Sequence, residues 1–187
     1  MQDKDVLNFL FEAGHLRRIK HEGWRLAGVE HPDSVADHTA RAAIIAYVLA
    51  TMEGYENPLE VAGMLVFHDI GECRVGDIHK VANRYVQADE AGAVKEQMAP
   101  LEELGKKIFA LWEGIEERKT KAGVIAKDAD YLEQALLAKE YVEHGHAAAQ
   151  DWITNITGAL RTESAKRLMK LLPEVKSTDW WSGLKKL

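Results

Sequence analysis

The sequence is poor in residues that form cross-links or interrupt helices. It contains one cysteine, Cys73, so no disulfide bond can form within the chain. Only four of its 187 residues are proline, and the alternation of apolar and polar residues that marks a β-strand never extends beyond a few positions. Long segments instead carry apolar residues at helical spacing. The sequence therefore predicts an all-α protein.

The chain also lacks long apolar runs and an excess of basic residues. Its longest apolar segments are too short to cross a bilayer, and its first five residues do not resemble a secretion signal. A net charge of −6 argues against binding to a nucleic-acid polymer, although it is compatible with a single nucleotide. We expect a cytoplasmic enzyme or binding protein with no membrane partner.

The length and the helical periodicity predict a single domain, because no linker or internal repeat divides the chain. A loop is expected over residues 21–33, and a loop or broken helix over 71–80. Residues 178–184 are expected to form a short turn. The expected helices cover residues 3–20, 34–52, 58–69, 85–98, 100–112, 119–144, 152–160 and 164–172.

One short stretch combines apolar and ionisable residues. The apolar run over residues 61–67 leads directly into His68 and Asp69, and burying such groups is costly unless they are paired. A divalent metal can accept neutral imidazole and carboxylate together. His38 lies on the buried face of the helix that begins at Ser34. We therefore expect a metal site built from several helices.

The helix expected over residues 119–144 supplies two candidate carboxylates. Asp128 and Asp130 both lie within it, and periodicity does not choose between them because the helix is apolar on most sides. Two histidines and two carboxylates suit a borderline or hard divalent cation with positions left for water.

The ordered set His38, His68-Asp69 and Asp130 resembles the H…HD…D pattern of the HD-domain metal-dependent phosphohydrolases. Further motifs are similar to the 5′-deoxynucleotidase branch of that family, namely Gly23-Trp24, Ser34 to His38, His68 to Cys73, and Gly76-Asp77-Ile78. The resemblance covers about residues 8–145. It leaves about residues 146–187 as a C-terminal helical extension of a single HD domain.

This resemblance implies a helical HD fold that hydrolyses 2′-deoxyribonucleoside 5′-monophosphates to deoxynucleoside and phosphate. It implies His38, His68, Asp69 and Asp130 as the metal ligands, with Asp130 chosen because residues 129–132 match the family's Ala-Asp-x-Leu ending. Manganese and cobalt are the expected ions, with zinc, iron and magnesium as alternatives. The resemblance also implies a homodimer.

The same resemblance gives Glu72 and Asp77 catalytic roles. Glu72 is expected to orient or deprotonate the attacking water, or to assist the leaving 5′-oxygen. Asp77 is expected to hold the sugar 3′-hydroxyl. An alternative implied by some relatives is a second metal bound by Glu72, Asp77 and the backbone of Ile78, and the sequence permits both interpretations.

The resemblance makes Trp24 the expected gate against ribose, since a bulky ring beside C2′ would exclude a 2′-hydroxyl. Bacterial members of the branch carry an arginine just before this tryptophan, whereas this chain has Gly23 there and Arg25 after it. Arg25 is therefore the expected substitute for binding phosphate. The other candidates for that role are Arg17, Arg18, Lys20 and Lys80.

Each assignment has a structural alternative. Trp24 could fill the core, Asp130 could be a helix residue paired with Lys127, and Trp180 and Trp181 are expected to pack on the core or on a second subunit. The remaining histidines are expected to be solvated or structural, namely His15, His21, His31, His79, His144 and His146. The competing functions are a phosphodiesterase or other phosphohydrolase of the HD class, and a non-catalytic nucleotide-sensing protein.

Overall fold

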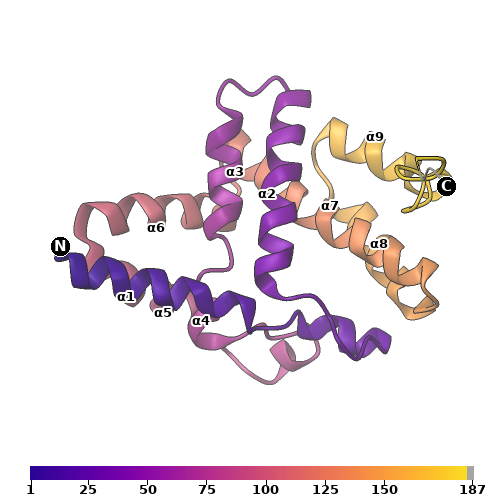
Figure 1. The fold of residues 1–187 in the computed structure, drawn as a ribbon. Coiled ribbons are helices and arrows are strands. Elements are labelled where there is room, and N and C mark those ends of the chain that lie inside the picture. The colour runs from indigo at the N-terminus through magenta and orange to yellow at the C-terminus, as the bar shows by residue number, and fades with distance from the viewer. Residues whose placement is uncertain (185–187) are drawn as a thin grey trace.

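The computed structural model describes residues 1–184 and consists of helices joined by loops and 3₁₀ turns (Figure 1). The only extended pairing among these residues is one antiparallel bridge between Lys20 and Ser34. The prediction of an all-α fold is confirmed. The helices are α1 (Asp3–Ala13), α2 (Val35–Met52), α3 (Pro58–Phe67), α4 (Glu72–Val75), α5 (Glu90–Met98), α6 (Glu102–Glu117), α7 (Lys121–Glu143), α8 (Gln150–Ala159) and α9 (Glu163–Leu171).

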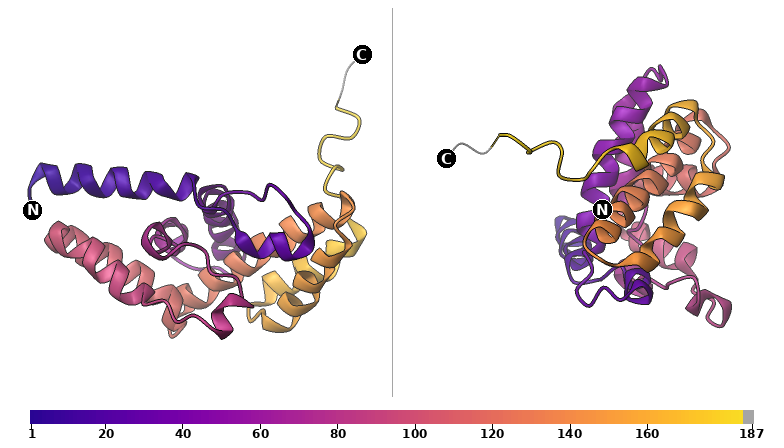
Figure 2. Two further views of the ribbon diagram at one scale, coloured as in Figure 1. Left: turned by 90° about the horizontal axis from the view of Figure 1, so that it is seen from below. Right: turned by 90° about the vertical axis from the view of Figure 1, so that its right-hand side faces the viewer.

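Helices α2, α3 and α7 form the centre of the molecule. Helices α2 and α3 stand side by side and α7 crosses behind them, while α1 and α6 extend to one side and α8 and α9 to the other (Figures 1 and 2). The side chains of Leu49, Val61, Leu65 and Ile125 between these helices are completely buried. Burying one such side chain contributes about 1.5–3 kcal/mol, so this core fixes the relative positions of the three helices.

The start of α2 is set by a reciprocal hydrogen-bond pair at Ser34. The backbone N–H of Asp37 donates to Ser34 Oγ over 3.2 Å, and the N–H of Ser34 donates to Asp37 Oδ2 over 2.9 Å. This confirms the capping box expected at that position, with aspartate in the place of the more usual glutamate. The cap fixes the helical register from its first turn, and that register buries His38.

Helix α3 begins where Asn57 accepts a hydrogen bond from the N–H of Glu60 over 3.3 Å, with Pro58 in the first turn. It ends at Phe67, so His68 is the first residue beyond the helix. Helix α7 begins after a cap at Thr120 and ends at Glu143. The boundaries expected for α2, α3 and α7 are therefore confirmed within two residues.

Four other segments differ from expectation, one of which is the helix expected over 100–112, since α6 continues to Glu117. The first helix ends at Ala13 and continues as a 3₁₀ turn over Gly14–Arg17, and the expected loop over 21–33 contains a 3₁₀ helix, Glu22–Ala27. The helix expected from Tyr85 begins at Glu90, because Asp89 accepts a hydrogen bond from the N–H of Gly92 over 2.8 Å and caps it there. Local caps, rather than apolar spacing, set this boundary.

The C-terminal segment leaves the helical body after Pro173. The chain beyond α9 projects away from the helices (Figure 2), and the Trp180 side chain is 77% exposed. The expectation that Trp180 packs on the core is wrong, whereas contact with a second subunit stays a prediction. The last three residues of the expected C-terminal extension lie outside the described residues. Within residues 1–184, no helix is both long and apolar enough to cross a membrane.

Candidate metal centre and active site

Two imidazoles and two carboxylates converge where α2, α3 and α7 meet. The Nε2 atoms of His38 and His68 lie 3.1 Å apart. Asp130 Oδ1 lies 3.3 Å from His38 Nε2, and Asp69 Oδ2 lies 3.0 Å from His68 Nε2. The fold thus brings together the four residues that the sequence nominated, from positions separated by up to ninety-two residues. Of these, His38, His68 and Asp130 form a group that could hold a metal ion.

The other ring nitrogens of the two histidines are already engaged. His68 Nδ1 donates to the carbonyl oxygen of Leu65 over 2.7 Å, and His38 Nδ1 donates to the carboxylate of Glu133. When Nδ1 carries the proton, a neutral imidazole directs its Nε2 lone pair outward. Two such lone pairs facing each other at 3.1 Å, beside carboxylate oxygens, match the donor set of a divalent cation.

The pKa values of these groups reflect a strongly acidic surrounding. Burial alone would lower the pKa of His38, but Asp130 and Glu133 raise it well above its ordinary value. Burial would also lower the pKa of His68, but Asp69 raises it above its ordinary value. Burial would raise the pKa of Asp69, but His68 and His38 lower it to about 2. The site therefore favours positive charge between its carboxylates.

Asp128 and Asp130 have different surroundings although they are two residues apart. Asp128 Oδ2 accepts hydrogen bonds from the N–H groups of Arg161 and Thr162, over 2.9 and 2.6 Å, where α9 is about to begin. Asp130 instead faces the histidine cluster and also pairs with Lys127, whose Nζ lies 2.8 Å from Oδ2. Asp130 thus forms the ion pair with Lys127 that an ordinary helix residue would form. It also lies where a metal ligand would be needed.

Glu133 and Arg41 support the cluster, and neither was nominated from the sequence. Glu133 is 1% exposed, and besides accepting from His38 it pairs with Arg41 Nη2 at 2.7 Å. Arg41 also pairs with Glu140 at 2.8 Å. The sequence does contain an indication of the role of Glu133, because this residue lies one helical turn beyond Asp130 in a helix that is buried on most sides. A glutamate at such a position needs a partner.

Glu72, Asp77 and Ile78 line a cavity of about 510 Å³, together with Glu90 and neighbouring residues. Burial and the charge of Asp69 raise the pKa of Glu72 to about 10, and its buried Oε2 has no hydrogen-bond partner among residues 1–184. Asp77 Oδ2 accepts a hydrogen bond from the N–H of Glu22 over 2.6 Å. Burial and Asp69 also raise the pKa of Glu90 to about 7. An acidic cavity thus includes residues directly beyond the HD dipeptide.

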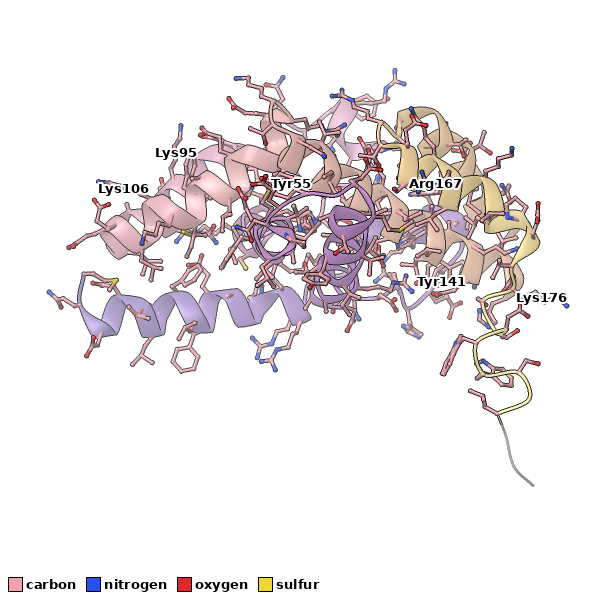
Figure 3. All side chains as sticks on the ribbon, turned by 90° about the horizontal axis from the view of Figure 1, so that it is seen from above. Tyr55, Lys95, Lys106, Tyr141, Arg167 and Lys176 are labelled. Carbon is pink, nitrogen blue, oxygen red and sulfur yellow. The ribbon has the colours of Figure 1, made fainter. Side chains whose placement is uncertain are left out.

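Trp24 and Arg25 precede the metal-site residues in the sequence and contact other parts of the molecule. The Trp24 side chain is 2% exposed, stacks on Trp152 with ring centroids 4.8 Å apart, and packs edge-on against Tyr141, which is labelled in Figure 3. Arg25 Nε donates to Glu22 Oε2 over 2.6 Å. Trp24 therefore fills a core, as its structural alternative required, while its role toward substrate stays a prediction, as does that of Arg25.

The expectation that His21 is solvated or structural is incomplete. Its ring lies against that of His38, with centroids 4.6 Å apart, and His21, His38 and Asp69 form a second group that could hold a metal ion. Burial and the neighbouring His38 lower the pKa of His21. His79, in contrast, has a local partner, because its Nδ1 accepts a hydrogen bond from the N–H of Ala82 over 3.2 Å.

The comparison with protein families matches the HD domain over residues 13–174. The chain belongs to the HD domain family. The HD match includes the histidine and aspartate cluster and extends through α9.

Known relatives of this HD chain are similar over most of its length. The 5′-deoxynucleotidase HDDC2 of Homo sapiens is 30% identical over 94% of this chain and 88% of its own, and that of Dictyostelium discoideum is 35% identical over 76% and 80%. Among solved structures, a conserved hypothetical protein from Pyrococcus furiosus is 27% identical with a TM-score of 0.75, covering 90% of this chain and 99% of its own.

Proposed function

We propose that this HD protein is a metal-dependent phosphomonoesterase, a 5′-deoxynucleotidase that converts 2′-deoxyribonucleoside 5′-monophosphates into deoxynucleoside and phosphate. The observation that carries the proposal is the pair of Nε2 atoms from His38 and His68, which face each other between Asp69 and Asp130. The activity named for relatives from animals and Dictyostelium discoideum supports the same reaction.

In this proposal His38, His68, Asp69 and Asp130 hold the divalent cation. Manganese or cobalt are the ions we expect, and zinc, iron and magnesium are compatible with the same nitrogen and oxygen donors. A bound cation lowers the pKa of a coordinated water toward neutrality and screens charge on the phosphoryl oxygens. Hydrogen bonds from the two Nδ1 atoms to Leu65 and Glu133 leave both Nε2 atoms available, and these atoms would bind the cation.

Glu72 is the proposed proton-transfer residue. Its carboxyl group lines the cavity next to the cluster, and a group with a raised pKa can exchange a proton with the attacking water or with the leaving 5′-oxygen. Asp77, on the same cavity wall, is proposed to hold the sugar 3′-hydroxyl. The alternative role of Glu72, Asp77 and the Ile78 backbone is to bind a second cation.

Trp24 and Arg25 are the proposed selectivity and phosphate residues. Trp24 would act by packing beneath the substrate site, since 2% exposure leaves its ring little direct contact with a ligand. Arg25 would have to exchange its contacts with Glu22 and with the Glu30 carbonyl for contacts with substrate.

We also propose a homodimer, a cytoplasmic location and a single domain. Leu7, Leu10 and Phe11 form an exposed apolar stripe along α1, and their side chains are 55%, 58% and 80% exposed. Apolar side chains gathered on one helix face support pairing with a second copy of the chain.

The cytoplasmic location follows from the proposed substrates, which are charged metabolites. Packing of α7 against α2 and α8 supports one domain.

The deciding experiment measures phosphate release from matched dAMP and AMP by chelator-treated protein, with metals added back one at a time. Metal-dependent release that is much faster from dAMP than from AMP is the expected result. Equal rates would leave a phosphohydrolase without deoxy selectivity. Absence of release with every metal would overturn the proposed activity.

A further inference from the structure

Backbone contacts fix His21 beside the first turn of α2. Its N–H donates to the carbonyl oxygen of Asp33 over 3.1 Å, and its neighbour Lys20 forms the antiparallel bridge with Ser34. Ser34 caps α2, whose first turn carries His38. The segment before the 3₁₀ helix is therefore tied to the helix that supplies a proposed metal ligand, which accounts for the contact between the two imidazole rings.

The next residue ties the same segment to the acidic cavity. The N–H of Glu22 donates to Asp77 Oδ2 over 2.6 Å, and Asp77 lines the cavity. His21 thus lies at the junction between the histidine cluster and the loop that carries Asp77. A nucleotide with its phosphate at the cluster and its sugar at Asp77 would pass this position.

The His21 imidazole has no hydrogen-bond partner within the protein. Its side chain is partly buried, and neither ring nitrogen forms a hydrogen bond with any residue in 1–184. One ring nitrogen lies within 4.8 Å of a His38 nitrogen and an Asp69 oxygen. An imidazole can form a hydrogen bond through each ring nitrogen, so a nitrogen that has no protein partner beside the cluster has capacity for a ligand.

The two basic side chains that contact the acidic residues of the cluster are already paired, and so is Arg25, the other proposed phosphate residue. Lys127 pairs with Asp130, Arg41 with Glu133, and Arg25 with Glu22. A phosphate monoester nevertheless needs several donors around its oxygens.

We propose that His21 is a substrate-binding residue whose ring N–H donates a hydrogen bond to the phosphoryl group, between the proposed metal ligands and Asp77. The inference rests on the proposed function, because it assumes a nucleotide monophosphate in this site. It assigns a phosphate contact to a residue before Gly23-Trp24, in addition to the contact proposed for Arg25.

The test compares His21→Leu, which removes both ring nitrogens, with His21→Asn, which restores a side-chain donor. The matched control is His15→Leu, because His15 is an exposed histidine on a neighbouring segment. Inorganic phosphate and deoxyadenosine are titrated separately into metal-loaded protein. We expect His21→Leu to weaken phosphate binding by about tenfold, the size of one hydrogen bond to a charged group. Deoxyadenosine affinity and metal content should be unchanged, and His21→Asn should recover part of the loss.

Two results would overturn the proposal. Loss of bound metal in His21→Leu would make His21 a ligand of the ion, and phosphate affinity equal to that of His15→Leu would make it a packing residue. If His21→Leu does not fold, the imidazole nitrogen resonances of the unsubstituted protein decide, since they must shift when phosphate is added. A protein that binds phosphate but releases none from dAMP would contradict the proposed function alone, because the titrations would still test His21.

Discussion

His38 donates its Nδ1 proton to the buried carboxylate of Glu133 and thereby directs Nε2 toward His68. Arg41 pairs with the other oxygen of Glu133, so the carboxylate keeps its charge in a buried position. Helix α7 contributes both Asp130 and this supporting glutamate, one turn apart. The ligand atom and the group that orients its neighbour are thus parts of one rigid helix.

We predict that Glu133→Gln lowers the affinity for the divalent cation by roughly 10–100-fold, the usual effect of losing such a supporting carboxylate. The amide keeps the size of the side chain but removes the negative charge that makes His38 a better ligand. Titration with Co²⁺, followed by its visible absorption, measures the change. Glu140→Gln is the control, since Glu140 contacts Arg41 but not His38; equal losses in both variants would refute a specific role for Glu133.

Asp128→Asn and Asp130→Asn should differ in their effects on metal binding and on stability. Asp130→Asn should abolish metal retention and phosphate release, because a proposed ligand is lost. Asp128→Asn should keep the metal but lower stability by about 1–3 kcal/mol, because Thr162 and Arg161 lose an acceptor. Metal analysis and thermal unfolding of both variants provide the measurement, and metal loss confined to Asp128→Asn would reverse the assignment.

Glu72→Gln should retain the cation and reduce kcat by roughly 10²–10⁴-fold, the range typical of a lost general acid or base. The amide occupies the same volume but cannot exchange a proton. Gln87→Ala, a substitution on the same cavity wall, serves as the control. An unchanged kcat would exclude Glu72 from proton transfer, and loss of a second equivalent of metal would favour its alternative role as a ligand.

Trp24 tests packing and selectivity together. Trp24→Ala should destabilise the protein by about 3–5 kcal/mol, because the buried ring stacks on Trp152. Trp24→Phe keeps an aromatic ring in the core, so it is the better variant for testing selectivity between deoxyribose and ribose. A narrower difference between dAMP and AMP rates in Trp24→Phe is the expected outcome, while an unaltered ratio would assign Trp24 to the core alone.

The proposed homodimer predicts that Phe11→Lys yields monomers. A charge placed in the exposed α1 stripe would have to be buried against the second copy, which is costly without a partner. Light scattering coupled to size exclusion measures the mass. Tyr85→Lys, at an 82% exposed position outside α1, should leave the mass unchanged. A monomeric unsubstituted protein would refute the dimer.

Several features of the fold and the site followed from local sequence. The capping box at Ser34 and Asp37 placed the start of α2 and with it the buried face of His38. The apolar run before His68 and Asp69 marked the end of α3. Such signals are readable because caps and apolar spacing act within a few residues. Apolar spacing predicts a helix start at Tyr85, whereas the cap at Asp89 sets the start of α5 at Glu90.

By itself, the sequence determined the all-α class, the family resemblance and the residues His38, His68 and Asp69 as members of one site. The resemblance also chose Asp130, although periodicity does not distinguish the sides of a helix that is buried nearly all round. Only the tertiary structure shows that Asp130 faces this site while Asp128 accepts hydrogen bonds from the N–H groups of Arg161 and Thr162. It also brought Glu133 and His21 to His38. Their contacts join segments far apart in the chain, and such contacts exist only once α2 and α7 have packed together.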